Sequence, residues 1–248
     1  MTEKFIEGRV VAQRRWTERL LSLQIEAEPL RFEAGQFTKL ALPADGGMIA
    51  RAYSFVNAPG HKPYEFYYVV VPEGPLTTRL ARLEAGDPVW LSPGPSGFLV
   101  LSEVPEAENL WMLATGTGLA PFLSILKSAT VWTRYRRVVL VEAVRRADEL
   151  AYRDAIEQLK SEYAGRFASV VFVSREPAPG ALGGRIPQAI AEGRLEAAAG
   201  IALSASDSQV MICGNPDMVA DTVQTLAQRG MKKHRRRSPG QITVENYW

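Results

Sequence analysis

The sequence predicts two domains: an antiparallel β-barrel over residues 1–100, then an α/β domain with a doubly wound parallel sheet over residues 101–248. Three observations support this fold class. Short β-rich runs separated by turn residues fill the first hundred residues, apolar strands alternate with amphipathic helices after residue 101, and a glycine turn at 115–118 opens the second pattern. With 248 residues, the chain is long enough for two domains that each bury a core.

The composition excludes several classes of protein. Hydrophobic residues at 46% and charged residues at 23% exclude a largely disordered chain. A net charge of only +2 excludes a global field that would attract nucleic acid or membranes, so we expect neither as a partner. The single cysteine, Cys213, excludes an internal disulfide and a four-cysteine cluster. Without a signal peptide or membrane span in the sequence, we expect a cytoplasmic protein, and we expect a monomer without a bound metal.

The elements of the first domain are expected to be strands with one short helix. Leu21, Leu23 and Ile25 alternate with polar residues, as in a half-buried strand. The expected strands cover residues 6–12, 20–27, 37–42, 50–56, 65–71 and 88–91. The segment 76–83 is expected to form a helix that packs on one end of the barrel, and closure of the barrel would remove exposed edges.

The second domain is expected to repeat a strand–helix unit. The expected strands are 110–114, 138–143, 169–173 and 209–213, and the expected helices follow Gly118 and cover 148–163, 186–192 and the segment after Asn215. Asn215 can cap that last helix, Pro216 fits its first position, and Asp217 suits its dipole. Such alternation implies a parallel sheet that binds ligands at the carboxyl ends of its strands.

Gly116 and Gly118 stand between an apolar strand run and a helical run. A glycine turn at a helix N-terminus leaves backbone N–H groups free and lets an anion approach closely. However, Pro121 stands where the dinucleotide-binding fingerprint Gly-x-Gly-x-x-Gly has its third glycine. By itself, the turn indicates either a phosphate site or a tight structural turn.

Two further segments of the first domain carry polar groups in useful positions. Arg51-Ala52-Tyr53-Ser54 places a cation, an aromatic ring and a hydroxyl on a strand, where Arg51 and Tyr53 project to the same side. Alone, this tetrapeptide is typical of a cross-strand aromatic residue beside a solvated cation. The segment 74–78, Gly-Pro-Leu-Thr-Thr, opens the expected helix and offers backbone N–H groups and hydroxyls for a second phosphate.

Six motifs, in this order along the whole chain, resemble the bacterial ferredoxin (flavodoxin)–NADP reductases of the plant-type ferredoxin reductase family. They are 51–54, the strand 65–71, 74–77, the Thr-Gly-Thr-Gly-Leu-Ala-Pro turn at 115–121, Cys-Gly-Asn-Pro at 213–216, and the terminal Tyr247-Trp248. The resemblance implies FAD on the barrel and NADP(H) on the parallel sheet. It also implies hydride transfer between nicotinamide C4 and flavin N5, with electrons then passing singly to ferredoxin or flavodoxin.

The resemblance implies roles for individual residues around the flavin. Tyr53 lies against the isoalloxazine ring, Ser54 near its N5 edge, and Arg51 on the FAD pyrophosphate. These roles are chemically reasonable for an aromatic ring, a hydroxyl and a guanidinium. The remaining implied contacts of the two cofactors are Ala52, Tyr67, Val69, Gly74, Leu76, Thr77 and Thr115 for FAD, with Gly116, Gly118 and Asn215 for NADP.

The resemblance also assigns the C-terminus. Glu245 and Tyr247 match the Glu-x-Tyr end of the plant-type reductases, whose tyrosine covers the flavin face that nicotinamide must reach. We expect Trp248 to stack on the FAD adenine, so the tail must move before hydride transfer. Ser54, Cys213, Glu245 and Tyr247 form the implied catalytic set.

NADP is expected rather than NAD. Glu142 stands near the distance at which NAD enzymes place an acidic residue on the ribose, but it falls inside a strand. The strand tips carry arginines instead, and arginine supplies the fork that a 2′-phosphate requires. Family members bind the 2′-phosphate at these places, which here hold Val144, Arg145, Ser174, Arg175 and Arg185.

Two features have open alternatives. Cys213 is either a buried small hydrophobe, or, as the resemblance implies, a residue that orients the nicotinamide. The run Lys-Lys-His-Arg-Arg-Arg at 232–237 is either a solvated face or a docking surface for an acidic ferredoxin or flavodoxin. For the whole protein, the rivals are a reductase component for an oxygenase or haem protein, and a non-catalytic nucleotide-sensing protein on the same scaffold.

Overall fold

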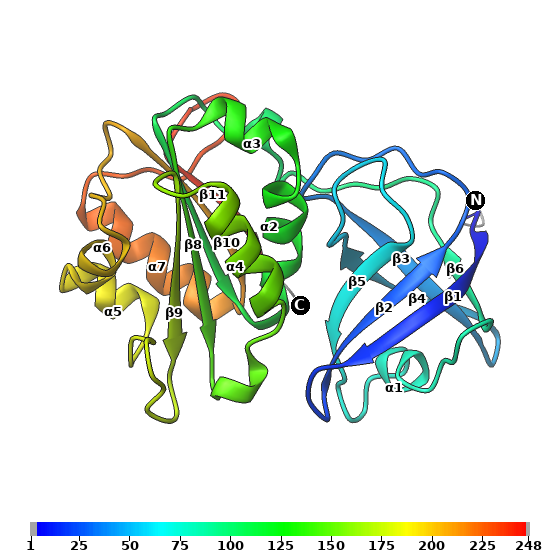
Figure 1. Ribbon diagram of the computed structural model, residues 1–248. Coiled ribbons are helices and arrows are strands. Elements are labelled where there is room, and N and C mark those ends of the chain that lie inside the picture. The colour runs from blue at the N-terminus through cyan, green and yellow to red at the C-terminus, as the bar shows by residue number, and fades with distance from the viewer. Residues whose placement is uncertain (1–3, 247–248) are drawn as a thin grey trace.

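The computed structural model describes residues 4–246 and contains one antiparallel and one parallel sheet, side by side (Figure 1). The antiparallel sheet has the order β4-β3-β6-β1-β2-β5. Its strands are β1 (Ile6–Arg15), β2 (Leu20–Glu26), β3 (Phe37–Ala44), β4 (Gly47–Ser54), β5 (Tyr64–Val69) and β6 (Pro88–Leu91). All six expected strands of the first domain are present, with ends that differ by a few residues.

The core of the first domain follows from the predicted alternation. Leu21, Leu23 and Ile25 on β2 are fully buried inside the curved sheet. The helix α1 (Thr77–Leu80) covers the sheet with the buried side chains of Leu76 and Leu80. It is shorter than the expected 76–83, because after Leu80 the backbone continues in i→i+3 turns rather than α-helix.

The prediction of a barrel is correct for the curvature of the sheet, but the prediction that the barrel closes is wrong, because the sheet remains open. β4 and β5 end the strand order. Within the part of the chain that the structure describes, these edges are joined by the isolated bridge between Phe55 and Phe66 and by the Val56 N–H, which donates to the Glu65 carbonyl at 2.8 Å. The ladder is short because the chain leaves β4 at Ser54 and packs Phe55 and Val56 into the core.

The parallel sheet has the order β11-β10-β7-β8-β9, which confirms the doubly wound α/β prediction. Its strands are β7 (Asn109–Thr115), β8 (Arg137–Val144), β9 (Phe167–Val173), β10 (Ser208–Gly214) and β11 (Ile242–Asn246). One face is covered by α2 (Leu119–Leu126), α3 (Ala129–Arg134) and α4 (Arg153–Glu162), and the other by α5 (Ile186–Ala191), α6 (Arg194–Ala199) and α7 (Pro216–Gln228). Short 3-10 turns are η1 (Leu101–Glu103), η2 (Gly116–Gly118) and η3 (Ala147–Glu149).

Two expectations for the second domain need correction. The single helix expected over 148–163 divides into η3 and α4, because Ala151 and Tyr152 turn into the core and Tyr152 has a left-handed φ of 57°. The chain end was expected only as a tail, but Glu245 and Asn246 belong to β11, an edge strand paired with β10. The helices α3 and α6 were also not expected.

Asn215 caps α7 as predicted, with its Oδ1 accepting from the N–H groups of Asp217 at 2.9 Å and Met218 at 3.2 Å.

The two sheets share a core at their junction, where α2 faces the barrel (Figure 1). Leu20, Val56 and Tyr67 of the first domain belong to the same buried cluster as α2. The Tyr152 hydroxyl donates to Glu65 Oε1 at 2.7 Å across the junction. Strand β6 ends at Leu91 and β7 begins at Asn109, and the domain boundary at residue 100 stays a prediction between them. No helix within residues 4–246 is both long and apolar enough to span a bilayer.

Candidate functional site

The site is centred on the glycine turn that ends β7. The neighbouring strand β10 ends beside it, and the two ends are locked together: the Asn215 N–H donates to Thr115 Oγ1 at 2.9 Å. A Cβ added at Gly118 would lie 2.4 Å from the Cys213 carbonyl oxygen, and one at Gly214 would lie 2.2 Å from Thr115 Oγ1. Glycine is therefore required here by close backbone packing.

Gly116 is required for a different reason. Its φ is +52°, and a Cβ built on it would meet no atom within 4 Å. The backbone at this position therefore lies open and takes a left-handed conformation that favours glycine. An open backbone at the start of α2 is what an approaching phosphate needs.

Cys213 and Glu245 stand opposite each other in the β10–β11 ladder. Cys213 is fully buried on the sheet face that α2 covers. Burial raises the pKa of the Glu245 carboxyl to about 7. Its Oε1 is buried without a hydrogen-bond partner among the described residues. A buried carboxyl in this condition is a candidate for contact with a ligand.

A run of contacts connects Glu245 to the barrel. A Cβ added at Gly97 would lie 3.4 Å from Glu245 Oε2 and 3.1 Å from the Phe37 ring. Phe37 is the β3 partner of Ser54, which ends β4. Ser54, Cys213 and Glu245, which lie far apart in sequence, therefore converge at the junction of the two domains.

The β4 tetrapeptide runs from this junction over the barrel surface. Ser54 is buried, Tyr53 is half-buried with its ring edge-on to Tyr68 at 6.0 Å, and Arg51 and Ala52 are exposed. Burial raises the pKa of Tyr53, so its phenol stays neutral. The exposed Arg51 guanidinium donates to the Ala50 carbonyl at 2.8 Å and keeps further donors for an anion.

The second expected phosphate segment is a compact turn. Thr77 Oγ1 accepts from the Val71 N–H at 3.0 Å, and a Cβ added at Gly74 would lie 2.6 Å from that oxygen. The Leu76 side chain is buried in the barrel core, so only its backbone is available to a ligand.

β5 brings Tyr67 and Val69 to the same junction, where the strand lies against η2. Tyr67 is buried and packs edge-on against Tyr152 at 5.3 Å. Burial, and then the nearby Glu142 charge, raises the pKa of Tyr67. Its hydroxyl therefore remains protonated.

The carboxyl ends of β8 and β9 bring two arginines together. The Arg175 N–H donates to the Arg145 carbonyl at 2.9 Å, and Ser174 Oγ donates to the Val144 carbonyl at 3.2 Å. Arg145 and Arg175 are exposed, and neither guanidinium has a partner among residues 4–246. Arg146, in contrast, pairs with Glu176 at 3.3 Å.

Arg185 occupies the N-cap position of α5 without a side-chain capping hydrogen bond, and it is exposed at the end of the loop that follows β9. Val144 is buried beneath the arginine tips. Glu142 is also buried, inside β8.

Sequence reasoning missed two parts of the site. Tyr152 has positive φ, and its ring contacts both Trp16 at 4.7 Å and Tyr67. Phe98 is 68% exposed beside Gly97, and the Arg236 guanidinium lies 5.1 Å from its ring. No sequence pattern predicts that Tyr152 adopts a positive φ. Phe98, in contrast, could have been found from its position directly after the turn residues Pro-Ser-Gly. Tyr247 and Trp248 lie outside the described residues.

Relatives of known identity match this chain along its whole length. The flavodoxin/ferredoxin–NADP reductase of Escherichia coli (strain K12) is 47% identical over 98% of this chain and 99% of its own length. The protein of the same description from Shigella flexneri is 48% identical over the same shares. The chain belongs to the flavodoxin/ferredoxin–NADP reductase family. The family of the oxidoreductase NAD-binding domain matches residues 112–224. A ferredoxin NADP+ reductase from Neisseria gonorrhoeae, solved with bound FAD and NADP, is 36% identical, covers 99% of both chains and superposes with a TM-score of 0.94.

The residues present fit the two cofactors of this reductase family. The open Gly116 backbone suits a pyrophosphate, and the exposed guanidinium groups suit phosphates. The buried Oε1 of Glu245, which has no hydrogen-bond partner within residues 4–246, is available to a polar group of a cofactor. Within the same residues, no three His, Cys, Asp or Glu side chains gather into a metal site.

Proposed function

We propose the following roles in a reductase that uses FAD to transfer electrons between NADPH and ferredoxin or flavodoxin. The observation that supports them best is the convergence of Ser54, Cys213 and Glu245 beside the Gly116–Gly118 turn. Bound FAD supplies the conversion between the two-electron chemistry of nicotinamide and the one-electron chemistry of ferredoxin or flavodoxin. The protein supplies position, exclusion of water and electrostatics.

The barrel side holds FAD. Tyr53 gives the flavin ring an aromatic face, Ser54 gives it a hydroxyl, and Arg51 pairs with the pyrophosphate. Tyr67, Val69 and Thr115 line the junction, and Ala52 contributes backbone. Gly74, Leu76 and Thr77 bind through the backbone and the Thr77 hydroxyl at the start of α1. Tyr247 and Trp248 cover the flavin and adenine, as the resemblance implies.

The parallel sheet holds NADP(H). Gly116 and Gly118 let the pyrophosphate approach the start of α2, beside Asn215. Arg145, Ser174, Arg175 and Arg185 bind the 2′-phosphate over Val144. The support for Arg145 and Arg175 is that their guanidinium groups are exposed and unpaired within the described residues, whereas Arg146 is engaged by Glu176.

Cys213 and Glu245 position the nicotinamide. Cys213 is a fully buried wall of the site, so it contributes shape. Desolvation raises the pKa of Glu245 to about 7, so this carboxyl changes charge near neutral pH. An ionised carboxylate stabilises the positive charge that develops on nicotinamide as NADPH is oxidised.

The acidic partner docks on the basic run 232–237. Arg236 pairs with Glu103, its Nη2 2.5 Å from Oε1, and stacks on Phe98. Gly97 next to Phe98 approaches Glu245, which supports a docking surface that reaches the edge of the site. The other cations of the run are exposed: Lys232, Lys233, Arg235 and Arg237. We further propose a monomer in the cytoplasm, where the single cysteine suits a reducing compartment.

Spectra and turnover of the purified protein test this function. The protein should carry the absorption bands of an oxidised flavin, and NADPH should bleach them under anaerobic conditions. Purified ferredoxin and flavodoxin should then be reduced at the expense of NADPH. A protein that takes up no FAD would support the non-catalytic alternative. A flavoprotein that reduces an oxygenase or haem partner but neither ferredoxin nor flavodoxin would support the other rival.

A further inference from the structure

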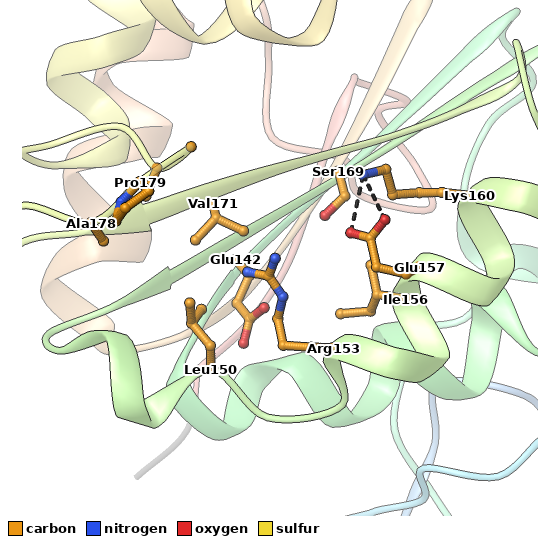
Figure 2. Close-up of a pocket in the computed structure, with 12 residues that line it drawn as sticks. Glu142, Leu150, Arg153, Ile156, Glu157, Lys160, Ser169, Val171, Ala178 and Pro179 are labelled. Atoms are coloured by element: carbon orange, nitrogen blue, oxygen red, sulfur yellow. Dashed lines mark hydrogen bonds and ion pairs between the residues drawn. The ribbon is translucent and has the colours of Figure 1, made fainter.

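A pocket of about 250 Å³ opens between α4, the edge strand β9 and the loop that returns along β9 (Figure 2). Its walls are partly apolar, with Leu150, Ile156 and Val171. The loop contributes residues 178–181, Ala-Pro-Gly-Ala, whose small side chains expose backbone to the space. The size suits a small organic molecule rather than a single ion.

Glu142 forms the most unusual part of this lining. It projects from β8 and is 1% exposed, and its Oε2 has no hydrogen-bond partner among the described residues. An unpartnered buried carboxyl is costly, so its retention calls for a polar partner in the pocket that it lines. Burial raises the pKa of Glu142 to about 8, with Arg153 opposing the shift. At neutral pH the carboxyl is therefore mostly an O–H donor that needs an acceptor.

The charges around Glu142 leave one cation without a balancing anion. On α4, Lys160 Nζ pairs with Glu157 Oε2 at 3.0 Å, so these two charges compensate each other. Arg153 also lies on α4, and Figure 2 shows its side chain extending into the space beside Glu142. Arg153 is exposed and has no hydrogen-bond or ion-pair partner within residues 4–246.

The other groups near Glu142 are neutral or distant from the pocket opening. From β9, Ser169 contributes a hydroxyl to the lining. From β5, Tyr67 stays protonated because burial, and then the charges of Glu142 and Glu149, raise its pKa. With Glu142 protonated, the pocket therefore carries a net positive charge at Arg153 and a hydrogen-bond donor at its base.

The pocket is separate from the residues proposed to bind NADP(H). Arg145, Ser174, Arg175 and Arg185 are absent from its lining. Glu142 shares the sheet face of Leu140, which packs in the α2 and α4 core. Ile186 at the start of α5 packs in the core on the opposite face.

We propose that this pocket binds a small organic carboxylate with a short apolar body. The ligand carboxylate pairs with Arg153, it accepts a hydrogen bond from protonated Glu142, and its apolar part contacts Leu150, Ile156 and Val171. Binding requires the proton on the Glu142 carboxyl, because an ionised Glu142 carboxylate would repel the carboxylate of the ligand.

A fluorinated probe tests the proposal on the FAD-loaded enzyme. Trifluorobutyrate is titrated while fluorine NMR follows the probe and methyl NMR follows Ile156, which reports occupation of this pocket. We expect millimolar binding at about pH 6.5, in keeping with so few ligand atoms, and a loss of at least about tenfold at about pH 9.5. Saturating NADP+ should leave the affinity unchanged.

Three variants sharpen the test. Arg153→Gln should weaken binding about tenfold or more, because the charge-assisted pair is lost. Glu142→Gln keeps a neutral donor, so it should retain binding at the lower pH and lose the pH dependence. Arg136→Gln removes another exposed arginine, at the opposite end of β8, and should change nothing. The flavin spectrum checks that each variant is folded.

Several outcomes would overturn the proposal. Absence of an Ile156 response to the carboxylate would show that the pocket does not bind this class. Tighter binding of trifluorobutylamine, increasing with pH, would make it a cation site. Displacement of trifluorobutyrate by NADP+ would assign the pocket to the coenzyme site, and an undiminished affinity in Arg153→Gln would remove the recognition argued here.

Discussion

Glu245 is a half-buried acid of the candidate site, and its ionisation should be visible in activity. Its pKa is raised to about 7 by burial, so the carboxyl is neutral below that pH and ionised above it. We expect the rate of flavin reduction by NADPH to increase as pH rises through about 7, because the carboxylate stabilises the charge developing on nicotinamide. Stopped-flow absorbance across this pH range measures the rate.

The variant Glu245→Gln keeps the shape of the side chain and cannot ionise. Its rate should be low and should lose the inflection near pH 7, while FAD remains bound. Linkage gives a second measurement. A raised pKa means that the folded state holds the proton more tightly, so this residue lowers stability as pH rises from its usual range to about 7. The variant should lose that part of the pH dependence of thermal unfolding. If the pH dependence of flavin reduction were the same in Glu245→Gln as in the parent, Glu245 would have no role in the reaction.

Arg145 and Arg175 should select NADPH over NADH. Both are exposed without a partner within residues 4–246, and their backbones are bonded across the strand tips. Arg175→Ala should reduce kcat/KM for NADPH by roughly 10- to 100-fold and leave the value for NADH nearly unchanged, because hydrogen bonds to charged groups contribute about 1.5–3 kcal/mol each. Steady-state kinetics with both coenzymes measures the change.

Arg146 provides the matched control for that comparison. It neighbours Arg145 in sequence, but its guanidinium is held by Glu176 at 3.3 Å. Arg146→Ala should therefore leave the preference for NADPH in place. Equal losses with both coenzymes in Arg175→Ala would contradict a role in binding the 2′-phosphate.

At the scale of elements, the two glycines of η2 serve different purposes and should respond differently to alanine. A Cβ at Gly118 would lie 2.4 Å from the Cys213 carbonyl oxygen, so β7 and β10 would have to separate. We expect Gly118→Ala to lower the free energy of unfolding by about 1–3 kcal/mol and to weaken NADP+ binding. Gly116→Ala meets open space but keeps a φ of +52°, which costs about 1 kcal/mol.

Urea unfolding and NADP+ titration of the two FAD-loaded variants distinguish these effects. Gly116→Ala should be more stable than Gly118→Ala. It should nevertheless bind NADP+ more weakly than the parent protein, because the added methyl group would stand where we propose that a phosphate approaches the backbone. If Gly118→Ala were as stable as the parent, the close packing of the turn against β10 would not constrain this site.

Most elements were predictable because their signals are local. The alternation of Leu21, Leu23 and Ile25 marks β2, and Asn215 with Pro216 marks the start of α7. The predicted helix over 148–163 was wrong because the break at Tyr152 is set by packing against Trp16 and Tyr67, which lie in the other domain. Tertiary contact there overrides helical propensity.

β11 shows a second limit of prediction. Its five residues gain their strand conformation by pairing with β10, and a short edge strand has no alternation strong enough to detect. The site residues were nevertheless named from motifs. What the motifs could not give was the contact run from Ser54 through Phe37 and Gly97 to Glu245, because it joins segments far apart in sequence.

The whole molecule is two domains joined by a shared core, with the candidate site at one end of that junction. Tyr152 bonds to Glu65, and Ser124 Oγ donates to the Asn57 carbonyl across the same junction. These contacts fix the glycine turn of one domain against β5 of the other. Cofactors held by separate domains can therefore keep one relative position, which is what transfer between two rings requires.

The basic run 232–237 concentrates positive charge on one part of the surface, although the net charge of the molecule is only +2. Arg236 pairs with Glu103 and lies 5.1 Å from the Phe98 ring, while Lys233, Arg235 and Arg237 are exposed and available to an acidic partner. Replacing these three by serine should reduce the second-order rate of ferredoxin or flavodoxin reduction by about tenfold or more at low salt. Stopped flow over a range of salt concentrations measures this rate.

The parent rate should fall as salt increases, and the rate of the triple variant should depend on salt far less, because screening acts on the charges that were removed. Arg9, Arg82 and Arg136 are exposed arginines elsewhere on the molecule, so their combined replacement by serine is the control for lost net charge. That control should keep the parent's rate and salt dependence. Reduction of the flavin by NADPH should be the same in all three proteins, since the run stands outside the residues assigned to NADP(H). If the control lost as much partner reduction as the run variant, attraction would come from net charge, and the run would be only a solvated face.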